Sequence, residues 1–295
     1  FMAPMLVILS FLNITPVLVY KFFPAIFAVF AAFFLFLLIY KLTKNYWISL
    51  FSIIFLSSLP NNVNLLGLWF AVPLTLAIPL IYLFFFFFIK AVNQNNNYKK
   101  NTIIATSVLF VLALVHGPSA AFLLPIIIIY SLVSYKEVRK KPFLIIILLP
   151  YLIYTFILFK AFWMGNLKTT YDQIKFNLQY VPDESSLNPS IYENPIITEF
   201  NNTILYTNQY FLPILYGIVP FILAMLGLFF SLKSRKLRIF AIWLLVIVFL
   251  LFLSKIIGID LIARNQRMTY YALLSLAPLS AIGLYKLINY IRNKL

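Results

Sequence analysis

The sequence predicts an all-α protein, a polytopic transmembrane bundle of about ten membrane segments in which residues 1–295 form one integral membrane domain. Hydrophobic residues make up 63% of the 295 residues and charged residues 10%, whereas a soluble protein is about half apolar and a quarter charged. A soluble domain of this length could not bury so much apolar surface. Apolar runs such as Ala25–Tyr40 and Phe143–Phe159 do not alternate, which excludes the period-two pattern of a membrane β-barrel.

Segments of about 20 residues, shortened where Pro or polar residues interrupt them, give ten predicted spans. The first two are separated only by a turn at Tyr20 and Lys21, flanked by Pro16 and Pro24 as expected where helices end. The fifth and sixth are short for a bilayer, and both a tilted pair and a re-entrant pair fit them. In chain order the spans are Ala3–Val19, Phe22–Tyr40, Trp47–Leu59, Leu68–Ile89, Thr102–Val115, Ala120–Ser134, Phe143–Phe162, Phe211–Leu232, Ile239–Leu253 and Met268–Ile288.

Basic residues are unevenly divided between the two sides of this layout. One side holds sixteen of the 23 Lys and Arg residues, mostly in short loops, and the positive-inside rule makes that side cytoplasmic. The net charge of +16 is therefore interpreted as a topology signal rather than as a nucleic-acid surface. The predicted cytoplasmic loops are Lys41–Tyr46, Lys90–Asn101, Tyr135–Lys141 and Lys233–Arg238.

The stretch Lys255–Tyr271 gathers scarce charges between the last two predicted spans, on the outer face. Asp260, Arg264 and Arg267 are spaced i, i+4, i+7, which places them on one face of a helix. Asp260 and Arg264 form an interfacial ion pair in one interpretation. In the other, the two arginines bind the phosphate of a lipid carrier, because a guanidinium donates two bonds to one phosphate. The predicted phosphate-binding residues are Lys255, Arg264 and Arg267, supported by Asp260, Tyr270 and Tyr271.

His116 is the only histidine and lies at the outer end of a predicted span. Gly117, Pro118 and Ser119 then force a sharp turn, after which Ser119 is expected to cap the next helix. A capping or interfacial role for His116 and a catalytic role both stay open. In the catalytic interpretation, His116 faces the same vestibule as the Lys255–Tyr271 stretch.

The only long polar segment, Trp163–Gln209, holds five of the seven acidic residues. Asp183 and Glu184 are its best pair for a general base or for a divalent metal. A solvated external loop is the alternative interpretation of this Pro- and Ser-rich segment. No acidic residue lies inside a predicted span, which disfavours proton transport through intramembrane carboxylates. Cysteine is absent, so disulfides and thiolate metal sites are excluded.

Three stretches carry a family resemblance: PNNVNLLGLWFAVPLTLAIPLIYL (60–83), LALVHGPSAAFLLPIIIIYSL (112–132) and ARNQRMTYYALLSLAPLSAIGLYKL (263–287). They resemble segments of prokaryotic GT-C-type membrane glycosyltransferases. The resemblance implies that a sugar is transferred from a polyprenyl-phosphate donor at the extracytoplasmic face. It also implies that Arg264 and Arg267 meet the donor phosphate, and that His116 matches the histidine of the family's H-P-L segment.

One departure from the family concerns its catalytic acid, which lies in the first outer loop. The corresponding loop here is Tyr20–Lys21, with no carboxylate. We therefore expect either that further spans precede Phe1 or that the chain is not an active transferase.

The expected function is a glycosyltransferase of the cell membrane, with the bilayer and a polyprenyl-phosphate-linked sugar as partners. A non-catalytic carrier or flippase of lipid-linked saccharides, and a polymerase or ligase of surface polysaccharide, are the alternatives. The sequence identifies no cofactor and no metal-binding cluster, and a divalent metal remains an open expectation. It predicts no nucleic-acid partner and leaves the oligomeric state undetermined.

Overall fold

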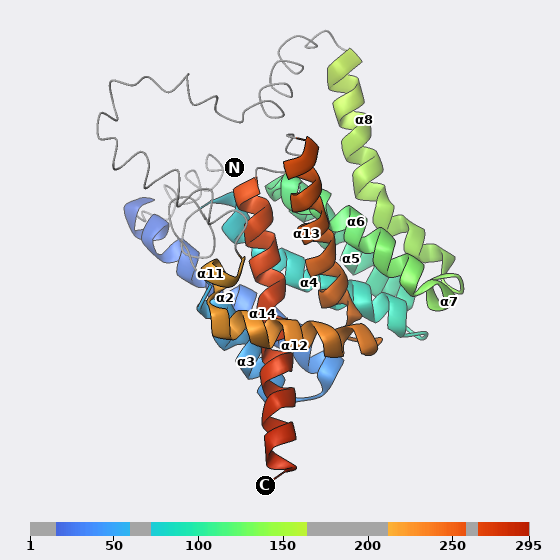
Figure 1. Ribbon diagram of the computed structural model, residues 1–295. Coiled ribbons are helices and arrows are strands. Elements are labelled where there is room, and N and C mark those ends of the chain that lie inside the picture. Colours follow the sequence, from blue (N-terminus) through green and yellow to red (C-terminus); the bar gives the residue numbers. More distant parts are fainter. Residues whose placement is uncertain (1–15, 60–71, 164–211, 258–264, 295) are drawn as a thin grey trace.

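The structure is a computed structural model that describes residues 16–59, 72–163, 212–257 and 265–294 (Figure 1). The side chains of residues 16–21, 157–163, 255, 257 and 265–267 lie outside the description. Over the described ranges every regular element is helical, which confirms the all-α class. The elements are α2 (Pro16–Thr43), α3 (Tyr46–Ser57), α4 (Pro73–Asn93), α5 (Tyr98–Val115), α6 (Gly117–Val133), α7 (Tyr135–Val138), the 3₁₀-helix η1 (Pro142–Leu148), α8 (Leu149–Trp163), α11 (Leu212–Tyr216), α12 (Ile218–Lys233), α13 (Arg238–Ile257) and α14 (Asn265–Arg292).

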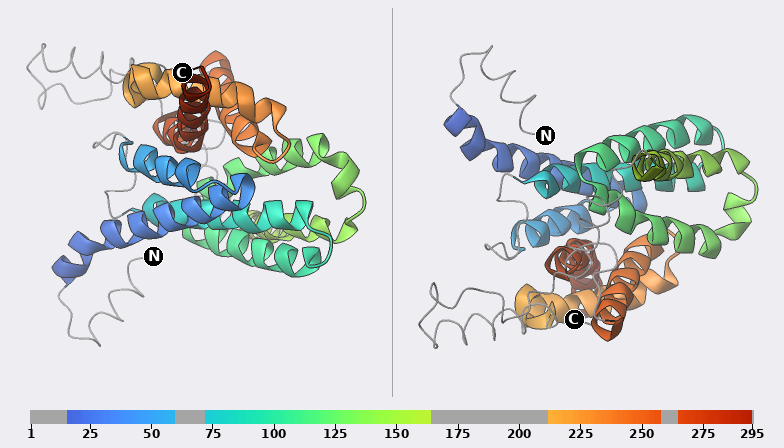
Figure 2. Two further views of the ribbon diagram at one scale, coloured as in Figure 1. Left: turned by 90° about the horizontal axis from the view of Figure 1, so that it is seen from below. Right: turned by 90° about the horizontal axis from the view of Figure 1, so that it is seen from above.

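Two helices, α4 and α14, form the interior of the bundle. α14 packs against α3, α12 and α13, while α4 packs against α2 and α5. In the views along the vertical axis, α14 is seen end-on with α12 and α13 beside it (Figure 2). From Met268 to Ile282 nearly every α14 side chain is buried, as expected for a helix that is apolar on all sides.

Four helical segments among the described residues are long and apolar enough to cross a membrane: Phe22–Thr43, Pro73–Asn93, Tyr98–Val115 and Met268–Arg292. A fifth results if α12 and α13, which meet at 119°, are counted together. The prediction of about ten spans is not confirmed. Several of the predicted spans correspond to shorter helices, such as α3 with 12 residues and α6 with 17. At 1.5 Å per residue these do not cover a hydrocarbon core of about 30 Å.

The predicted turn at Tyr20 and Lys21 is wrong, because α2 continues through both residues and through Pro24. In an apolar environment every backbone group must be bonded within the chain. Tyr20 and Lys21 are only two polar residues within an apolar run, and they do not end the helix. The first predicted span, Ala3–Val19, otherwise lies outside the described residues.

Predicted cytoplasmic loops meet on one face of the molecule. Glu137, in α7, forms an ion pair with Arg235 in the turn between α12 and α13. Lys141, which follows α7, donates hydrogen bonds to carbonyl oxygens at the end of α4. In Figure 1 the C-terminus lies at the bottom, whereas α8 and α13 end and α14 begins toward the top. Three of the four predicted cytoplasmic loops are therefore linked to one another, and the cytoplasmic identity of their face remains a prediction.

Candidate functional site

His116 connects α5 and α6 by itself. Its backbone N–H donates to Leu112 at the end of α5 (2.8 Å), and its carbonyl accepts from Ser119 in the first turn of α6 (3.0 Å). Pro118 stands in that first turn, where the missing N–H removes no helical hydrogen bond. His116 is therefore the single residue between α5 and α6, and the Gly-Pro-Ser sequence after it forms the first turn of α6.

The side chains of His116, Ser119 and Tyr271 form a buried hydrogen-bonded network, which we call the HSY network. Ser119 Oγ lies 2.6 Å from His116 Nδ1 and 2.7 Å from the hydroxyl of Tyr271. The Tyr271 hydroxyl is also 3.4 Å from His116 Nδ1. Tyr271 belongs to α14, so the HSY network joins two segments that are more than 150 residues apart in sequence.

The geometry assigns the tautomer of the imidazole. The backbone N–H of Ser119 points at His116 Nδ1 from 3.3 Å, and this donor requires a lone pair on that nitrogen. With Nδ1 as the acceptor, the Ser119 hydroxyl can donate to it and accept from the Tyr271 hydroxyl, and the proton of the neutral ring is then on Nε2.

Burial makes the HSY network a fixed part of the core. Ser119 and Tyr271 are fully buried, and His116 is 8% exposed. The ring of Tyr271 stacks on Phe122 with centroids 4.0 Å apart, and Phe122 also contacts the buried indole of Trp243. Buried polar groups are stable only when they are hydrogen-bonded, so the three residues hold one another in position.

The structure corrects one expected role within this site. Ser119 was expected to cap α6, but the cap is His116, whose side chain accepts the Ser119 N–H. Ser119 instead uses its hydroxyl to connect the histidine to Tyr271. His116 contacts Tyr271, the last residue of the Lys255–Tyr271 stretch, and the vestibule that the two were expected to share stays a prediction.

Several predicted site residues lie outside the described part of the chain. These are Asp183 and Glu184 in the long segment, Asp260 and Arg264 before α14, and the side chains of Lys255 in α13 and Arg267 in α14. Tyr270 is fully buried in α14. The structure thus assembles the histidine with the tyrosine of the predicted site and does not test the charged residues.

Glu137 is the single acidic residue within the described ranges, and it lies on the face with the basic loops. Those ranges contain no group of three or more His, Cys, Asp or Glu side chains placed to hold a metal ion. The described residues accordingly supply neither a metal site nor a carboxylate beside His116.

Removing the hydroxyl of Tyr271 is expected to lower the free energy of unfolding by about 1–2 kcal/mol, because Ser119 loses a buried donor. Tyr271→Phe keeps the ring and its stacking on Phe122, so the change isolates the hydrogen bond. Unfolding in detergent measures the double-mutant cycle with Ser119→Ala. The double variant should lose less free energy of unfolding than the two single variants lose in sum. Additive losses would show that the two hydroxyls do not interact. Tyr290→Phe is the control, because Tyr290 is exposed on the same helix.

The sequence analysis did not predict that Ser119 connects His116 to Tyr271. It also did not predict that Phe122 and Trp243 pack next to this contact. The spacing of His116 and Ser119, i and i+3 across a Gly-Pro turn, was the available signal for their contact. No local pattern indicates that Tyr271 completes the HSY network or that Trp243 lies beneath Phe122. No protein-family model, curated protein or solved structure matches this chain.

Proposed function

We propose that this chain is a membrane glycosyltransferase that transfers a sugar from a polyprenyl-phosphate donor at the extracytoplasmic face of the cell membrane. The observation that carries the proposal is the HSY network. It joins the two segments, 112–132 and 263–287, that resemble the histidine-containing and the late segments of GT-C-type enzymes. Two segments that form one site in such an enzyme should contact each other, and here they do through Ser119 and Tyr271.

The donor phosphate is expected at the start of α14. This helix begins at Asn265, directly after Arg264, and Arg267 stands in its first turn. The N-terminus of a long helix carries a partial positive charge and unpaired N–H groups, both of which favour a phosphate. Tyr271 follows Arg267 by one turn, so its bond to Ser119 anchors the helix beside the proposed site.

The proposed reaction forms a bond between the acceptor oxygen and the anomeric carbon of the sugar, and it breaks the bond between that carbon and the phosphate oxygen of the donor. Arg264 and Arg267 stabilise the charge of the departing polyprenyl phosphate. The acceptor hydroxyl loses its proton to a base, for which Asp183 and Glu184 are the candidates. His116 is the third candidate, and its Nδ1 is hydrogen-bonded to Ser119.

Arg264→Ala combined with Arg267→Ala is expected to lower transfer roughly tenfold or more, because charge-assisted bonds to the phosphate are lost. The measurement follows both products, the transferred sugar and free polyprenyl phosphate, in vesicles that contain the purified chain. Arg292→Ala with Lys294→Ala removes two charges from the other end of α14 and serves as the matched control.

Each outcome of this assay has a definite meaning. Unchanged transfer in a well-expressed double variant would remove the two arginines from the mechanism. Movement of the labelled saccharide across the membrane without release of polyprenyl phosphate would identify a carrier and overturn the transferase proposal. Neither movement nor release by the wild-type protein would reject both functions for the donor used.

A further inference from the structure

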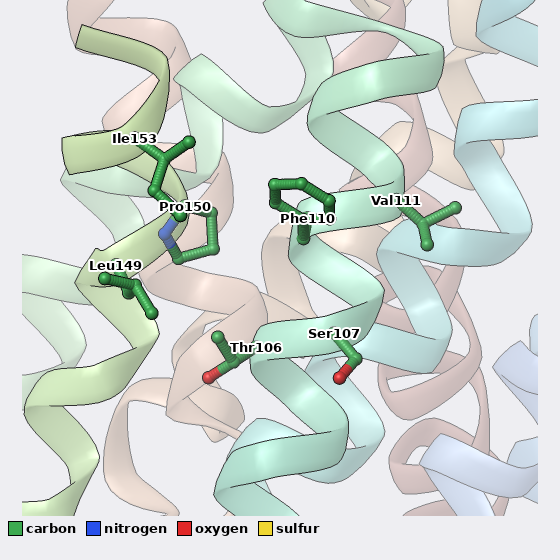
Figure 3. Close-up of a pocket in the computed structure, with 7 residues that line it drawn as sticks. All are labelled: Thr106, Ser107, Phe110, Val111, Leu149, Pro150 and Ile153. Carbon is green, nitrogen blue, oxygen red and sulfur yellow. The ribbon is translucent and has the colours of Figure 1, made fainter. Parts of the chain in front are cut away.

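A groove runs between α5 and the helical segment formed by η1 and α8. Its volume is about 380 Å³, and it is lined by Phe110 and Val111 of α5 and by Leu149 and Ile153 of α8 (Figure 3). These four apolar side chains are all exposed. The groove is therefore open on the outside of the bundle, at the surface that a bilayer would cover.

The hydroxyls of Thr106 and Ser107 mark the end of the groove nearer to the start of α5 (Figure 3). Thr106 donates to the backbone of Thr102, so its oxygen still has accepting capacity. The wall is thus apolar toward the middle of α5 and α8 and polar at one end.

Two exposed lysines stand beyond that polar end, on the same face of α5. Lys99 precedes Thr106 by seven residues and Phe110 by eleven, and Lys100 has the same spacing to Ser107 and Val111. Residues seven and eleven apart lie on one side of an α-helix, at a rise of about 10 Å for seven residues. The lysines consequently continue the line of the groove.

The opposite wall ends in basic residues as well. Arg139 and Lys140 are exposed and precede the buried Lys141, after which η1 begins at Pro142. The start of α5 adds the partial positive charge of a helix N-terminus. Glu137, the single acidic residue of the described ranges, is paired with Arg235, so no carboxylate there is left to neutralise this end.

We propose that the groove binds an anionic phospholipid of the surrounding bilayer, with one acyl chain between α5 and α8 and the phosphate at Lys99 and Lys100. This apolar groove ends, about 10 Å farther along α5, in basic residues that have no carboxylate partner within the described ranges, and that arrangement matches a lipid with a negative headgroup. Basic clusters at the ends of membrane helices attract such lipids. The proposal is independent of the transfer reaction and concerns the opposite end of the molecule.

The test measures lipid binding to the delipidated full-length protein in detergent. Phosphatidylglycerol and phosphatidylcholine with identical acyl chains, and glycerol 3-phosphate, are added separately, and bound lipid is counted by native mass spectrometry alongside thermal unfolding. Phosphatidylglycerol is expected to bind and to raise the unfolding temperature, phosphatidylcholine to act far more weakly, and glycerol 3-phosphate not to act.

Two variants assign this binding to the groove. Lys99→Gln with Lys100→Gln should weaken phosphatidylglycerol binding roughly 30-fold, the factor that corresponds to two lysine–lipid attractions near the surface. Val111→Trp should block the acyl chain and weaken both lipids. Lys236→Gln with Lys294→Gln makes the same charge change elsewhere on the basic face and should leave binding within about twofold.

Three results would overturn the proposal. Equal binding of the two lipids that survives both variants would mean unspecific coating of the apolar surface. A stabilisation reproduced by glycerol 3-phosphate would identify a site for a soluble phosphate. An equal loss in the Lys236 and Lys294 control would mean attraction by overall charge. Because mass spectrometry counts lipid on folded protein only, a variant that folds poorly still gives a readable result.

Discussion

Replacing Gly283 with leucine is expected to separate α14 from α12 and to destabilise the protein by about 3 kcal/mol or more. A Cβ at this position would lie 2.9 Å from the carbonyl carbon of Leu223 and 3.0 Å from the backbone nitrogen of Gly227, and closer still to the Leu223 oxygen. These are backbone atoms, which cannot rotate away. Ordinary overpacking costs about 1–3 kcal/mol, and here two whole helices have to move.

Gly227 makes the same contact from the other helix. Its added Cβ would lie 2.7 Å from the carbonyl carbon of Leu279. Small residues at such crossings allow membrane helices to approach backbone to backbone, and Figure 1 shows α12 running across α14. The apparent unfolding temperature and the monodisperse fraction in detergent should therefore fall in both Gly227→Ala and Gly283→Ala, with larger losses for leucine.

Combining the substitutions at Gly227 and Gly283 tests whether the two glycines belong to one helix contact. Once one substitution has pushed the helices apart, the second has less to disturb, so Gly227→Ala with Gly283→Ala should cost less than the sum of the single changes. Gly117→Ala is the control, because its Cβ would meet the Tyr154 hydroxyl at an ordinary 3.5 Å. Wild-type stability in the leucine variants would show that the helices do not cross at these residues.

Lys141→Met is expected to lower the free energy of unfolding by about 2–3 kcal/mol. Lys141 is only 4% exposed, and its Nζ donates to the carbonyls of Ala91, Val92 and Gln94 at 3.2, 2.6 and 2.8 Å. A helix leaves its last carbonyls without partners, and this ammonium supplies partners at the end of α4. Hydrogen bonds to a charged group contribute about 1.5–3 kcal/mol each, reduced here by the desolvation of the ammonium.

Hydrogen exchange locates the effect of Lys141→Met, since protection should be lost first in the last turn of α4. Lys140→Met is the matched control, because its side chain is exposed and surface changes stay within about 0.5 kcal/mol. Equal losses in the two variants would mean that general charge, rather than the bonds to α4, stabilises this region.

The pH dependence gives an independent measurement. Burial lowers the pKa of Lys141 from its ordinary value. Between the folded and the unfolded pKa the unfolded chain binds more protons, so stability rises with pH over that interval. The difference in stability between wild type and Lys141→Met should accordingly widen as the pH rises from the lowered pKa of the folded state to that of an unperturbed lysine, about 10.4.

The positions of several helices could be predicted from the sequence. Trp47–Leu59 and Leu68–Ile89 correspond to α3 and α4, and the apolar run to Ile288 lies within α14. The ends of the helices were less predictable. Polar residues favour a turn, whereas the need to hydrogen-bond every backbone group favours a longer helix. Lys90–Asn101 was predicted as a loop, yet α4 runs to Asn93 and α5 starts at Tyr98.

The candidate site was predictable only as separate parts. The single histidine at a predicted span end indicates His116, and the clustered charges indicate the stretch that ends at Tyr271, each from its own local sequence. That Ser119 joins them depends on α6 and α14 lying side by side, and no residue near Ser119 in the chain encodes that. The arginines before α14 stay a prediction, because their side chains lie outside the described residues.

The sequence by itself determined an apolar, helical chain with basic loops, since composition and run length fix which segments avoid water. Only the tertiary structure decided how the helices pair. In a chain whose helices are apolar on most sides, periodicity does not show which face meets which neighbour. Pairing is instead set by backbone contact at Gly227 and Gly283, by the bonds of Lys141 to α4, and by the HSY network, all of which join distant residues.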